Sequence, residues 1–433
     1  MVRRSVRSLF ALAAVPIWIA CGGGDSAAPE PETGLDAPDR SVDVQTTPVF
    51  TVGGFNAPDW AAFGNVRQVA FDDRGHLFIL DTQANQVTEV DAEGQFVRTI
   101  GGPGEGPGEL SSPFGFALTD DGGLAIFDIG HQGWVTYDAS GEFMGNVRVD
   151  MGTIGLPGNR LSRHPDGGVV GAVGGRIRMG GPGAAGSEPE APSRPVVYFA
   201  LSEEDSSRVV YDAWDMPEPP EGEEANLSTG GGGSFQIRMP VLRAFEPELR
   251  AGALPDGRIA VVDSIGYRIK LVADGGSVVD VLERPIAPIE VTGGIEEAER
   301  ERRIAELEAD AGGSTTVVAI GGGGMTTNTV GGGMSDMMRN RVESMIFADE
   351  IPVIEDMAVD PLGRIWVQRS GDTPGEAGPT DLITADGRYL GSIPADGLRI
   401  PQAFGPDGLI VRREVDEFDV PTLIVERLPA EIG

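Results

Sequence analysis

Apolar residues in this chain occur in short runs, and a tight glycine turn precedes many of them. Six such units recur: DDRGHLFILD (72–81), DDGGLAIFD (120–128), PDGGVVGAV (165–173), PDGRIAVVD (255–263), PLGRIWVQR (361–369) and PDGLIVRR (406–413). Glycine after Asp supplies the positive φ of a hairpin turn, and the following Val, Ile, Leu and Phe residues favour strands. The pattern therefore predicts six β-hairpins.

A second glycine turn extends several of these units: DAEG (91–94), DASG (138–141), ADGG (273–276) and ADGR (385–388). Each unit then contains about four strands. The first unit predicts strands at 66–72, 76–81, 86–91 and 95–100, and the second predicts strands at 114–119, 124–128, 133–138 and 142–149. Uninterrupted units repeat about every 45 residues, which is the size of a four-stranded propeller blade.

One segment carries a family resemblance. The run FDDRGHLFILDTQANQVTEVDAEGQFVRTIGGPGEGPGEL (71–110) resembles an NHL-type repeat of the NHL and TolB-like six-bladed propellers. The likeness is strong over 66–149, moderate over 248–284 and 351–413, and weak over 158–216. The resemblance implies an all-β fold, a six-bladed β-propeller of four-stranded blades. It says almost nothing about activity.

The two ends of the folded region complement each other. The last unit has only three strands, at about 399–404, 408–413 and 421–427. VFTVGGF (49–55) matches FVRTIGG (96–102), which is the fourth strand of the first unit. We therefore expect 49–55 to complete the sixth blade and to remove an open sheet edge.

The N-terminal residues read as a targeting segment. Residues 1–20 have a basic start, and the apolar stretch from Leu9 to Ala20 is too short to span a bilayer. Cys21, the single cysteine, follows directly. This arrangement resembles a bacterial lipoprotein signal peptide, which implies cleavage before Cys21 and lipid attachment to it. The alternative is an ordinary secretory signal with a chance cysteine.

The residues after the cysteine bear on location. Lipoproteins retained at the inner membrane of many Gram-negative bacteria carry Asp next to the lipidated cysteine, whereas this chain has Gly22. The resemblance therefore implies a cell-envelope protein that the lipid on Cys21 holds in the outer membrane. Residues 21–48 are rich in Gly, Ala, Pro and acidic residues and predict a flexible tether. The propeller is then expected to occupy 49–433.

Charge excludes some partners. The 433 residues include 33 Lys+Arg and 67 Asp+Glu, for a net charge of -34. Such a chain repels nucleic acid, so we expect no nucleic-acid partner. One cysteine cannot form an intrachain disulfide or a cysteine zinc site. Hydrophobic residues make up 40%, enough for a packed core.

Long segments fall on one face of the predicted propeller. In each blade, the loop between the second and third strands and the connection to the next blade share one face, here named the long-loop face. The opposite face, with the glycine hairpins, is named the tight-turn face. The long segments are 174–194, 216–245, 286–350 and 370–381. One-sided elaboration of a rigid scaffold is typical of recognition.

The largest inserted segment, 286–350, predicts two helices. They span 294–311 and 335–347, with Gly- and Thr-rich sequence between them. One interpretation is a lid or partner-docking element with soft methionine contacts. The alternative is that the second helix packs on the propeller to bury its own apolar side, formed by Met338, Val342, Met345 and Ile346.

Acidic residues recur where the second strands end. Counting six residues on from each turn glycine gives Asp81, Asp128, Val173, Asp263, Arg369 and Glu414. The four carboxylates of Asp81, Asp128, Asp263 and Glu414 predict a ligand or metal ring at the mouth, because Ca²⁺ prefers carboxylate oxygen. The senescence-marker/gluconolactonase families use acidic funnel residues in this general way. The alternative is that each Asp accepts backbone N–H groups and caps its turn.

Histidine chemistry is not favoured. His131 belongs to the long-loop face, whereas His76 and His164 belong to the tight-turn face, so a three-histidine site like that of the NHL-type lyases is not expected. A Ser-His-Asp triad would have only His131 as its base. The glycine-rich run 320–333 lacks the Gly-Lys-Ser/Thr ending of a phosphate loop.

Together these features favour a binding module. We expect a lipid-anchored propeller that binds an envelope protein, peptide or glycan through its long-loop face, with no catalysis and no cofactor of its own. The alternative is a Ca²⁺-dependent lactonase-like or lyase-like hydrolytic enzyme with an acidic funnel site. A third interpretation is a structural module of an envelope assembly. Tightly bound divalent metal would distinguish the first two.

Overall fold

The computed structural model describes residues 34–430 and 432, apart from 152–153, 174–193, 203–204, 214–222, 229–233, 240, 311–315, 322–323 and 330–332. The signal segment 1–20 and the expected lipidation site Cys21 lie outside the described residues. So does the inserted loop predicted at 174–194, except for Arg194.

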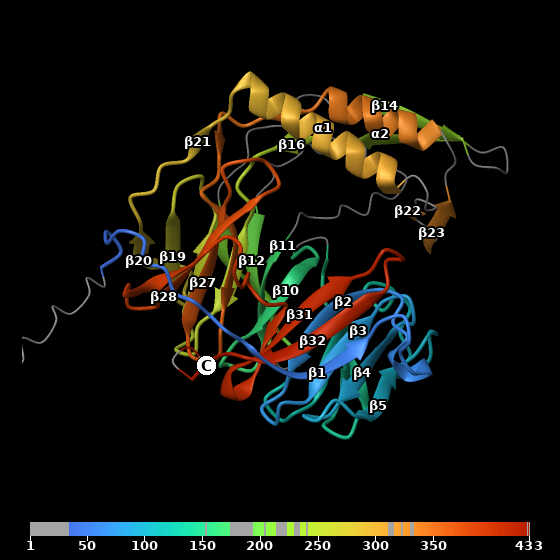
Figure 1. The fold of residues 1–433 in the computed structure, drawn as a ribbon. Helices are drawn as coiled ribbons and strands as arrows, with labels where there is room; N and C mark the ends of the chain where they lie inside the picture. The colour runs from blue at the N-terminus through green and yellow to red at the C-terminus, as the bar shows by residue number, and fades with distance from the viewer. Residues whose placement is uncertain are drawn as a thin grey trace, which may run out of the picture. The chain divides into compact units, whose positions relative to one another are not determined.

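Six four-stranded antiparallel sheets form the propeller (Figure 1). The first three blades are β2 (Val66–Phe71), β3 (Leu77–Asp81), β4 (Gln86–Val90) and β5 (Phe96–Gly101); β6 (Pro113–Leu118), β7 (Leu124–Asp128), β8 (Gly133–Tyr137) and β9 (Phe143–Arg148); β10 (Pro157–Arg163), β11 (Val169–Val173), β12 (Arg194–Phe199) and β13 (Arg208–Ala213). The fourth and fifth are β17 (Arg250–Ala253), β18 (Ile259–Val262), β19 (Arg268–Val272) and β20 (Val278–Glu283); β26 (Ile354–Val359), β27 (Arg364–Ser370), β28 (Ala377–Thr384) and β29 (Tyr389–Ile393). The predicted fold class is confirmed.

The sixth blade closes the ring with both ends of the chain. Its strands are β30 (Ala403–Phe404), β31 (Leu409–Val415), β32 (Pro421–Arg427) and β1 (Thr47–Gly53). β1 pairs antiparallel with β32, with Thr51 opposite Ile424. The predicted closure by the N-terminal strand is confirmed, because this strand covers an edge of β32 that would otherwise be open.

Glycine turns set the blade register. The turn glycine between the first and second strands has a φ between 73° and 91° in all six blades. In the first blade, Asp72 Oδ1 accepts hydrogen bonds from the backbone N–H groups of Arg74 and His76, both at 2.9 Å. Gly75 completes that turn at φ 81°, where a side chain would be strained. The local sequence therefore determines where each hairpin reverses.

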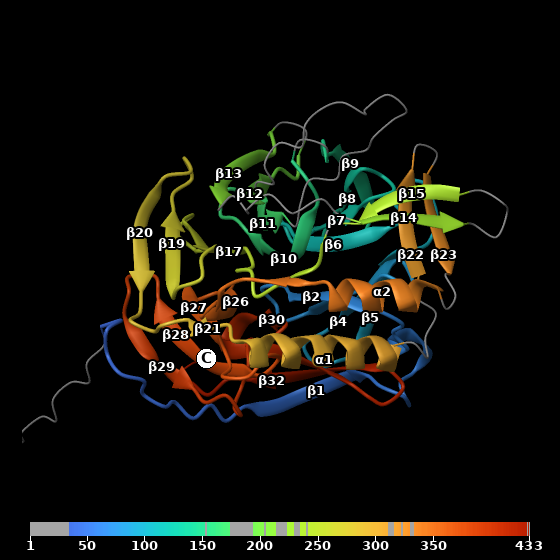
Figure 2. The same cartoon turned by 90° about the horizontal axis from the view of Figure 1, so that it is seen from above.

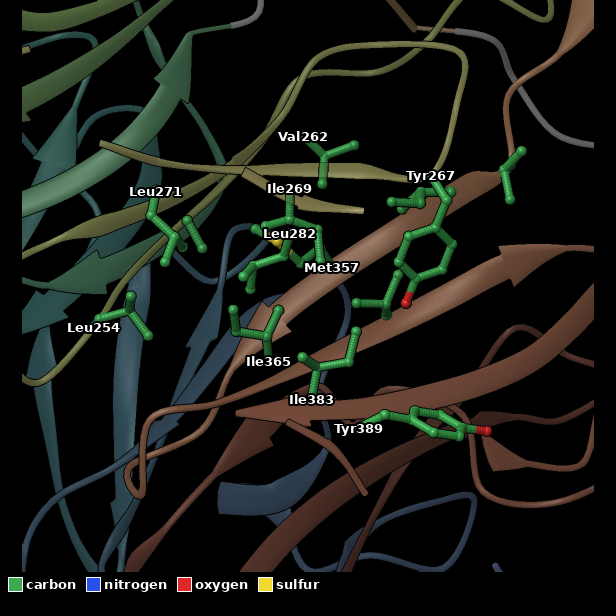
Figure 3. Close-up of a cluster of buried hydrophobic side chains, with 14 of the residues drawn as sticks. Leu254, Val262, Tyr267, Ile269, Leu271, Leu282, Met357, Ile365, Ile383 and Tyr389 are labelled. Carbon is green, nitrogen blue, oxygen red and sulfur yellow. The ribbon is translucent and has the colours of Figure 1, made fainter. Parts of the chain in front are cut away.

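The core lies between neighbouring blades. Figure 3 shows the cluster between the fourth and fifth blades, in which Val262, Ile269 and Leu271 face Met357 and Ile365. These side chains come from alternate positions of strands whose two faces are both covered, so the strands read as continuous apolar runs.

Residues 34–46 differ from the predicted flexible tether. Ser41 forms a parallel bridge with Ser392 on the outer strand of the fifth blade. The N–H of Val42 donates to the carbonyl of Ser392 at 2.8 Å, and the N–H of Ser392 donates to the carbonyl of Arg40 at 2.8 Å. Ala37 is buried in the cluster of Figure 3. These residues, named the strap here, are therefore part of the propeller rather than a free linker.

The inserted segments form a small layer on the long-loop face (Figures 1 and 2). Its elements are β14 (Glu223–Ser228), β15 (Ser234–Met239), β16 (Arg243–Ala244), β21 (Ile289–Glu290), α1 (Gly293–Asp310), β22 (Thr316–Gly321), β23 (Gly324–Thr329), α2 (Gly333–Glu343), β24 (Ile346–Phe347) and β25 (Glu350–Ile351). Two short 3-10 helices, η1 (Asp59–Ala61) and η2 (Pro406–Gly408), lie elsewhere. Within the described residues, neither α-helix is long and apolar enough to cross a membrane.

The two predicted helices exist, but the second ends early. α2 stops at Glu343, and Ile346–Phe347 forms β24, which pairs parallel with β16. Val342 and Met345 are each 3% exposed and pack with Ala244. The apolar residues at the end of α2 are thus buried, but against α1 and residues 242–245 of another inserted segment rather than against a blade, as the packing alternative expected.

Candidate functional site

The predicted acidic ring contains two carboxylates that cap turns. Asp81 is 2% exposed, and its oxygens accept backbone N–H groups of Gly64 (2.8 Å), Asn65 (3.0 Å) and Gln83 (2.9 Å). Asp128 is fully buried, and its Oδ2 accepts the N–H groups of Ser111 and Ser112, both at 2.9 Å. These are the contacts that the capping alternative expects.

The other two predicted ring residues have different surroundings. Asp263 is buried, and its Oδ2 accepts hydrogen bonds from Lys270 Nζ (2.7 Å) and the Tyr211 hydroxyl (3.0 Å). Glu414 is exposed and pairs with Arg412 at 3.2 Å. Within the described part of the chain, the four carboxylates do not form a cluster of metal-ligand spacing.

One cluster of metal-ligand type occurs among the described residues, on the tight-turn face. Ligand atoms of Asp72, His76 and Glu89 all lie within 4.8 Å of one another. Glu89 is 1% exposed and already accepts Arg98 Nε at 2.5 Å, while His76 Nδ1 lies 2.8 Å from it. Because a guanidinium already occupies the carboxylate, this donor set does not fit Ca²⁺, which takes six to eight oxygen ligands.

Each histidine has neighbours of its own. His131 Nδ1 lies 3.0 Å from Asp128 Oδ1 on the long-loop face. His164 is 2% exposed, and its Nε2 lies 3.0 Å from the carbonyl oxygen of Gly257. His76 Nδ1 lies next to Glu89, so the three rings have different neighbours, whereas the blade phase predicted only that His131 lies apart from the other two.

A cavity on the propeller axis was not predicted from the sequence. The first strands of neighbouring blades contact one another, and a channel of about 850 Å³ is lined by residues from all six of them. At its long-loop end a second cavity of about 710 Å³ lies among the starts of β6, β10, β17 and β26. Both volumes are in the range of small-molecule sites.

Charged side chains line the mouth cavity. Arg160 Nη2 lies 2.8 Å from Asp356 Oδ2, and Arg250 Nε lies 3.0 Å from Asp356 Oδ1. One carboxylate from the fifth blade therefore holds guanidinium groups from the third and fourth. Arg194 and Glu248 complete the charged lining.

Irregularities in the first strands of the blades determine the direction of some side chains at the mouth. The first strand of several blades has a register shift near its start, which spans Arg67 in β2, Phe114 in β6, Arg160 in β10 and Glu355 in β26. A β-bulge redirects a side chain and is common next to binding sites. The guanidinium of Arg67 lies 3.7 Å above the ring of Phe114.

Some charged groups at the propeller mouth are partly shielded from water. Burial raises the pKa of Glu355 above its ordinary value of 4.5, and Arg399 opposes the shift. Burial also lowers the pKa of Arg194, and Glu246 and Glu248 oppose it. Charges in such surroundings interact more strongly than they do in water.

The inserted layer is joined to the cavity wall. β16 pairs with β24, and the Phe245 ring lies 5.7 Å from that of Phe347. Phe245 has a φ of 63°, which is rare for a bulky residue and marks a constrained backbone. Three residues later, Glu248 begins the part of the chain that lines the cavity up to Ala251.

The three residues of the shared ion pair at the mouth have a common spacing in the sequence. Arg160, Arg250 and Asp356 each lie seven residues before the turn glycine of their blade. The prediction counted forward from that glycine to the end of the second strand, and so selected other positions, two of which, Asp81 and Asp128, cap turns.

Comparisons with known proteins agree with this architecture. The family model DUF5128, described as a 6-bladed beta-propeller, matches residues 56–159. A protein of Bacteroides fragilis NCTC 9343 described as exported is similar in structure, with 11% identity, a TM-score of 0.47, and coverage of 91% of this chain and 98% of that chain. No curated protein matches the chain.

Two further solved structures are similar at lower scores. The calcium-binding protein regucalcin of Agrobacterium tumefaciens C58 has 15% identity and a TM-score of 0.40, with coverage of 90% of this chain and 96% of that chain. Virginiamycin B lyase of Staphylococcus aureus has 11% identity and a TM-score of 0.38, with coverage of 88% and 99%. The chain is thus a six-bladed β-propeller of four-stranded blades, similar over 56–159 to the family described as 6-bladed beta-propellers.

Proposed function

We propose that this protein is a non-catalytic binding module of the bacterial cell envelope, and that its ligand enters the mouth cavity on the long-loop face. The ligand is an envelope protein segment, peptide or glycan. Lipid on Cys21 anchors the chain, in the outer membrane according to the sequence after the cysteine. The single observation that carries the binding role is the cavity of about 710 Å³ at the propeller mouth.

Two structural features support this site over the rest of the surface. First, Arg160, Arg250 and Asp356 converge there from three blades, and such convergence of polar groups in a concave site is typical of ligand binding. Second, the inserted layer attaches directly to the cavity wall through β16. A ligand in the cavity would therefore contact rigid blades close to the point where the inserted layer joins them.

The test uses the full chain extracted from membranes. Native mass spectrometry of this protein should detect a bound small molecule or peptide. The variant Ala172→Phe places a large side chain at the cavity wall and should abolish that adduct. Glu93→Ala, at an exposed tight turn on the other face, is the matched control and should retain it.

The same preparation separates binding from the enzyme alternative. Stoichiometric Ca²⁺ in the purified protein, together with hydrolysis of lactones that Ala172→Phe abolishes, would contradict the non-catalytic assignment. An adduct that persists in Ala172→Phe would contradict the assignment of the site.

A further inference from the structure

We propose that the mouth cavity recognises a ligand with one carboxylate group on an apolar body, and that Arg160 and Arg250 bind the carboxylate. This inference rests on the proposed binding function and names the chemical class of the ligand. An acylated amino acid or the C-terminus of a peptide with an apolar last residue has this chemistry.

The charge balance of the cavity differs in sign from that of the chain. The chain has twice as many acidic as basic side chains, 67 against 33. The cavity lining instead contains Arg160, Arg194 and Arg250 against Glu248 and Asp356. The excess of one positive charge matches one carboxylate.

Neighbouring charged groups leave that balance unchanged. Glu355 and Arg399 interact electrostatically with each other beside the cavity. Glu246 forms ion pairs with Arg194 and with Arg243. Each added acid is thus accompanied by an added arginine, so the mouth as a whole keeps its positive excess.

The arginines have donors to spare and fixed positions. A guanidinium carries five N–H donors. Arg160 contributes Nη2 to Asp356, and its side chain makes no other hydrogen bond within the described residues. Arg250 contacts Asp356 through Nε and Glu248 through Nη2, so two of its three nitrogens already have an acidic partner. Side chains of Arg160 and Arg250 are 37% and 32% exposed, so the remaining donors are accessible from the cavity.

Sharing one counter-ion also fixes the geometry. Both guanidinium groups contact the two oxygens of Asp356, so they are held close together before any ligand arrives. Planar guanidinium groups bind carboxylates through paired hydrogen bonds, and a pre-positioned pair loses little side-chain entropy on binding.

The rest of the cavity wall is apolar. Phe114, Leu156, Leu249 and Met357 line it beside the charged groups. A fully hydrated dianion such as phosphate would leave these side chains without a partner. A carboxylate attached to an aliphatic or aromatic group would cover them, and burial of each CH₂ group contributes about 0.8 kcal/mol in general.

The test compares matched probes by isothermal titration calorimetry with the full chain. N-acetyl-leucine should bind at the cavity, whereas the uncharged N-acetyl-leucinamide and inorganic phosphate should bind at least roughly tenfold more weakly, because a charge-assisted hydrogen bond is lost or the apolar contacts are missing. Arg160→Gln and Arg250→Gln should each weaken N-acetyl-leucine binding roughly tenfold or more for the same reason.

Two further variants make the result specific. Asp356→Asn removes the competing negative charge but keeps a side-chain oxygen that can hold the two arginines in place, so it should tighten N-acetyl-leucine binding up to roughly fivefold. A merely structural role for the ion pairs predicts the opposite sign. Arg258→Gln, an arginine at a tight turn of the fourth blade, should have no effect. Circular dichroism melts establish that every variant is folded.

The outcomes separate this inference from the proposed function. Equal binding of N-acetyl-leucine and its amide, both lost in Ala172→Phe, overturns the carboxylate inference and retains the binding site. Stronger binding of phosphate than of N-acetyl-leucine also overturns it. If none of the three probes binds at millimolar concentration while native mass spectrometry shows an adduct, the carboxylate class is wrong. If there is no adduct either, the proposed function fails as well.

Discussion

Carboxylates near the propeller mouth divide according to the groups that contact them. Asp81 and Asp128 are buried and accept backbone N–H groups of the preceding inter-blade connection. Asp356 is partly exposed, and its polar contacts within the described residues are the guanidinium groups of other blades and the N–H of its own neighbour Met357. A capping carboxylate stabilises a turn, whereas one that faces a cavity between two arginines can be displaced or joined by a ligand.

Replacement of Asp128 should therefore affect stability rather than binding. Asp128→Ala leaves the partly buried N–H groups of Ser111 and Ser112 without this acceptor, which should lower the free energy of unfolding by about 1–3 kcal/mol. Urea unfolding measures this change. If Asp128→Ala instead unfolds like the wild type and loses bound divalent metal, the acidic-ring interpretation is correct.

The ion pair between Glu426 and Arg412 gives a pH-dependent prediction. Hydrogen bonds from Arg412 hold the pKa of Glu426 below its ordinary value of 4.5. A carboxyl group whose pKa is lower in the folded state contributes stability that is fully present above its unfolded pKa and is lost as the pH falls through the folded value. Glu426→Gln should therefore destabilise the propeller at pH 7.

The size of that effect should depend on pH in one direction. The difference in unfolding free energy between wild type and Glu426→Gln should stay constant from pH 7 to about pH 5.5 and shrink at lower pH. Urea titrations at several pH values measure it. A difference that grows on acidification would contradict the assigned sign.

At the scale of elements, the strap is held by a buried arginine. Arg284 is 2% exposed at its side chain and donates to Asp381 (2.7 Å), to Asp39 (3.0 Å) and to the carbonyl of Ala37 (2.9 Å). The Asp381 side chain is fully buried. Through its bonds to Asp39 and Ala37 of the strap and to Asp381 of the fifth blade, Arg284 therefore joins the strap to the fourth and fifth blades.

Removal of this arginine should be costly. Arg284→Met leaves the buried Asp381 with the Ser392 hydroxyl and the more distant Arg369 (3.7 Å) as partners, so it should lower the free energy of unfolding by about 3 kcal/mol. Arg258→Gln, which breaks an exposed ion pair with Asp256, should change it by less than about 1 kcal/mol. Similar melting temperatures for the two variants would show that the strap does not contribute to the fold.

The outer strand β1 gives a second prediction at this scale. Deletion of 47–53 exposes one edge of β32 and removes Val52 from its apolar cluster, so the melting temperature should fall and aggregation should rise. Deletion of 22–32, which precedes the strap, is the control. Equal melting temperatures would mean that β32 does not need its outer partner.

Local signals account for what could be predicted at this scale. A glycine turn and the apolar strand after it lie within ten residues, so Gly75 and its counterparts revealed the hairpins and their phase. The strap has no such signal, because its main partner, Arg284, is 247 residues from Ala37. Arg160 and Asp356 are separated by 196 residues, so no spacing rule brings them together.

At the scale of the whole molecule, charge and concavity point to the same place. The net charge is -34, yet arginines outnumber carboxylates in the lining of the mouth cavity. A strongly negative surface repels anions at long range, so a concave site in which arginines outnumber carboxylates is a favourable destination for an anionic ligand. The inserted layer attaches to the wall of that same cavity.

Photo-crosslinking in intact cells tests the central claim most directly. A photoreactive amino acid is placed at Leu156, in the cavity wall, or at Glu93, on the tight-turn face. Binding in the mouth cavity predicts a specific adduct from position 156, which added N-acetyl-leucine reduces, and no adduct from position 93. A partner captured from position 93, with no adduct from position 156, would contradict it.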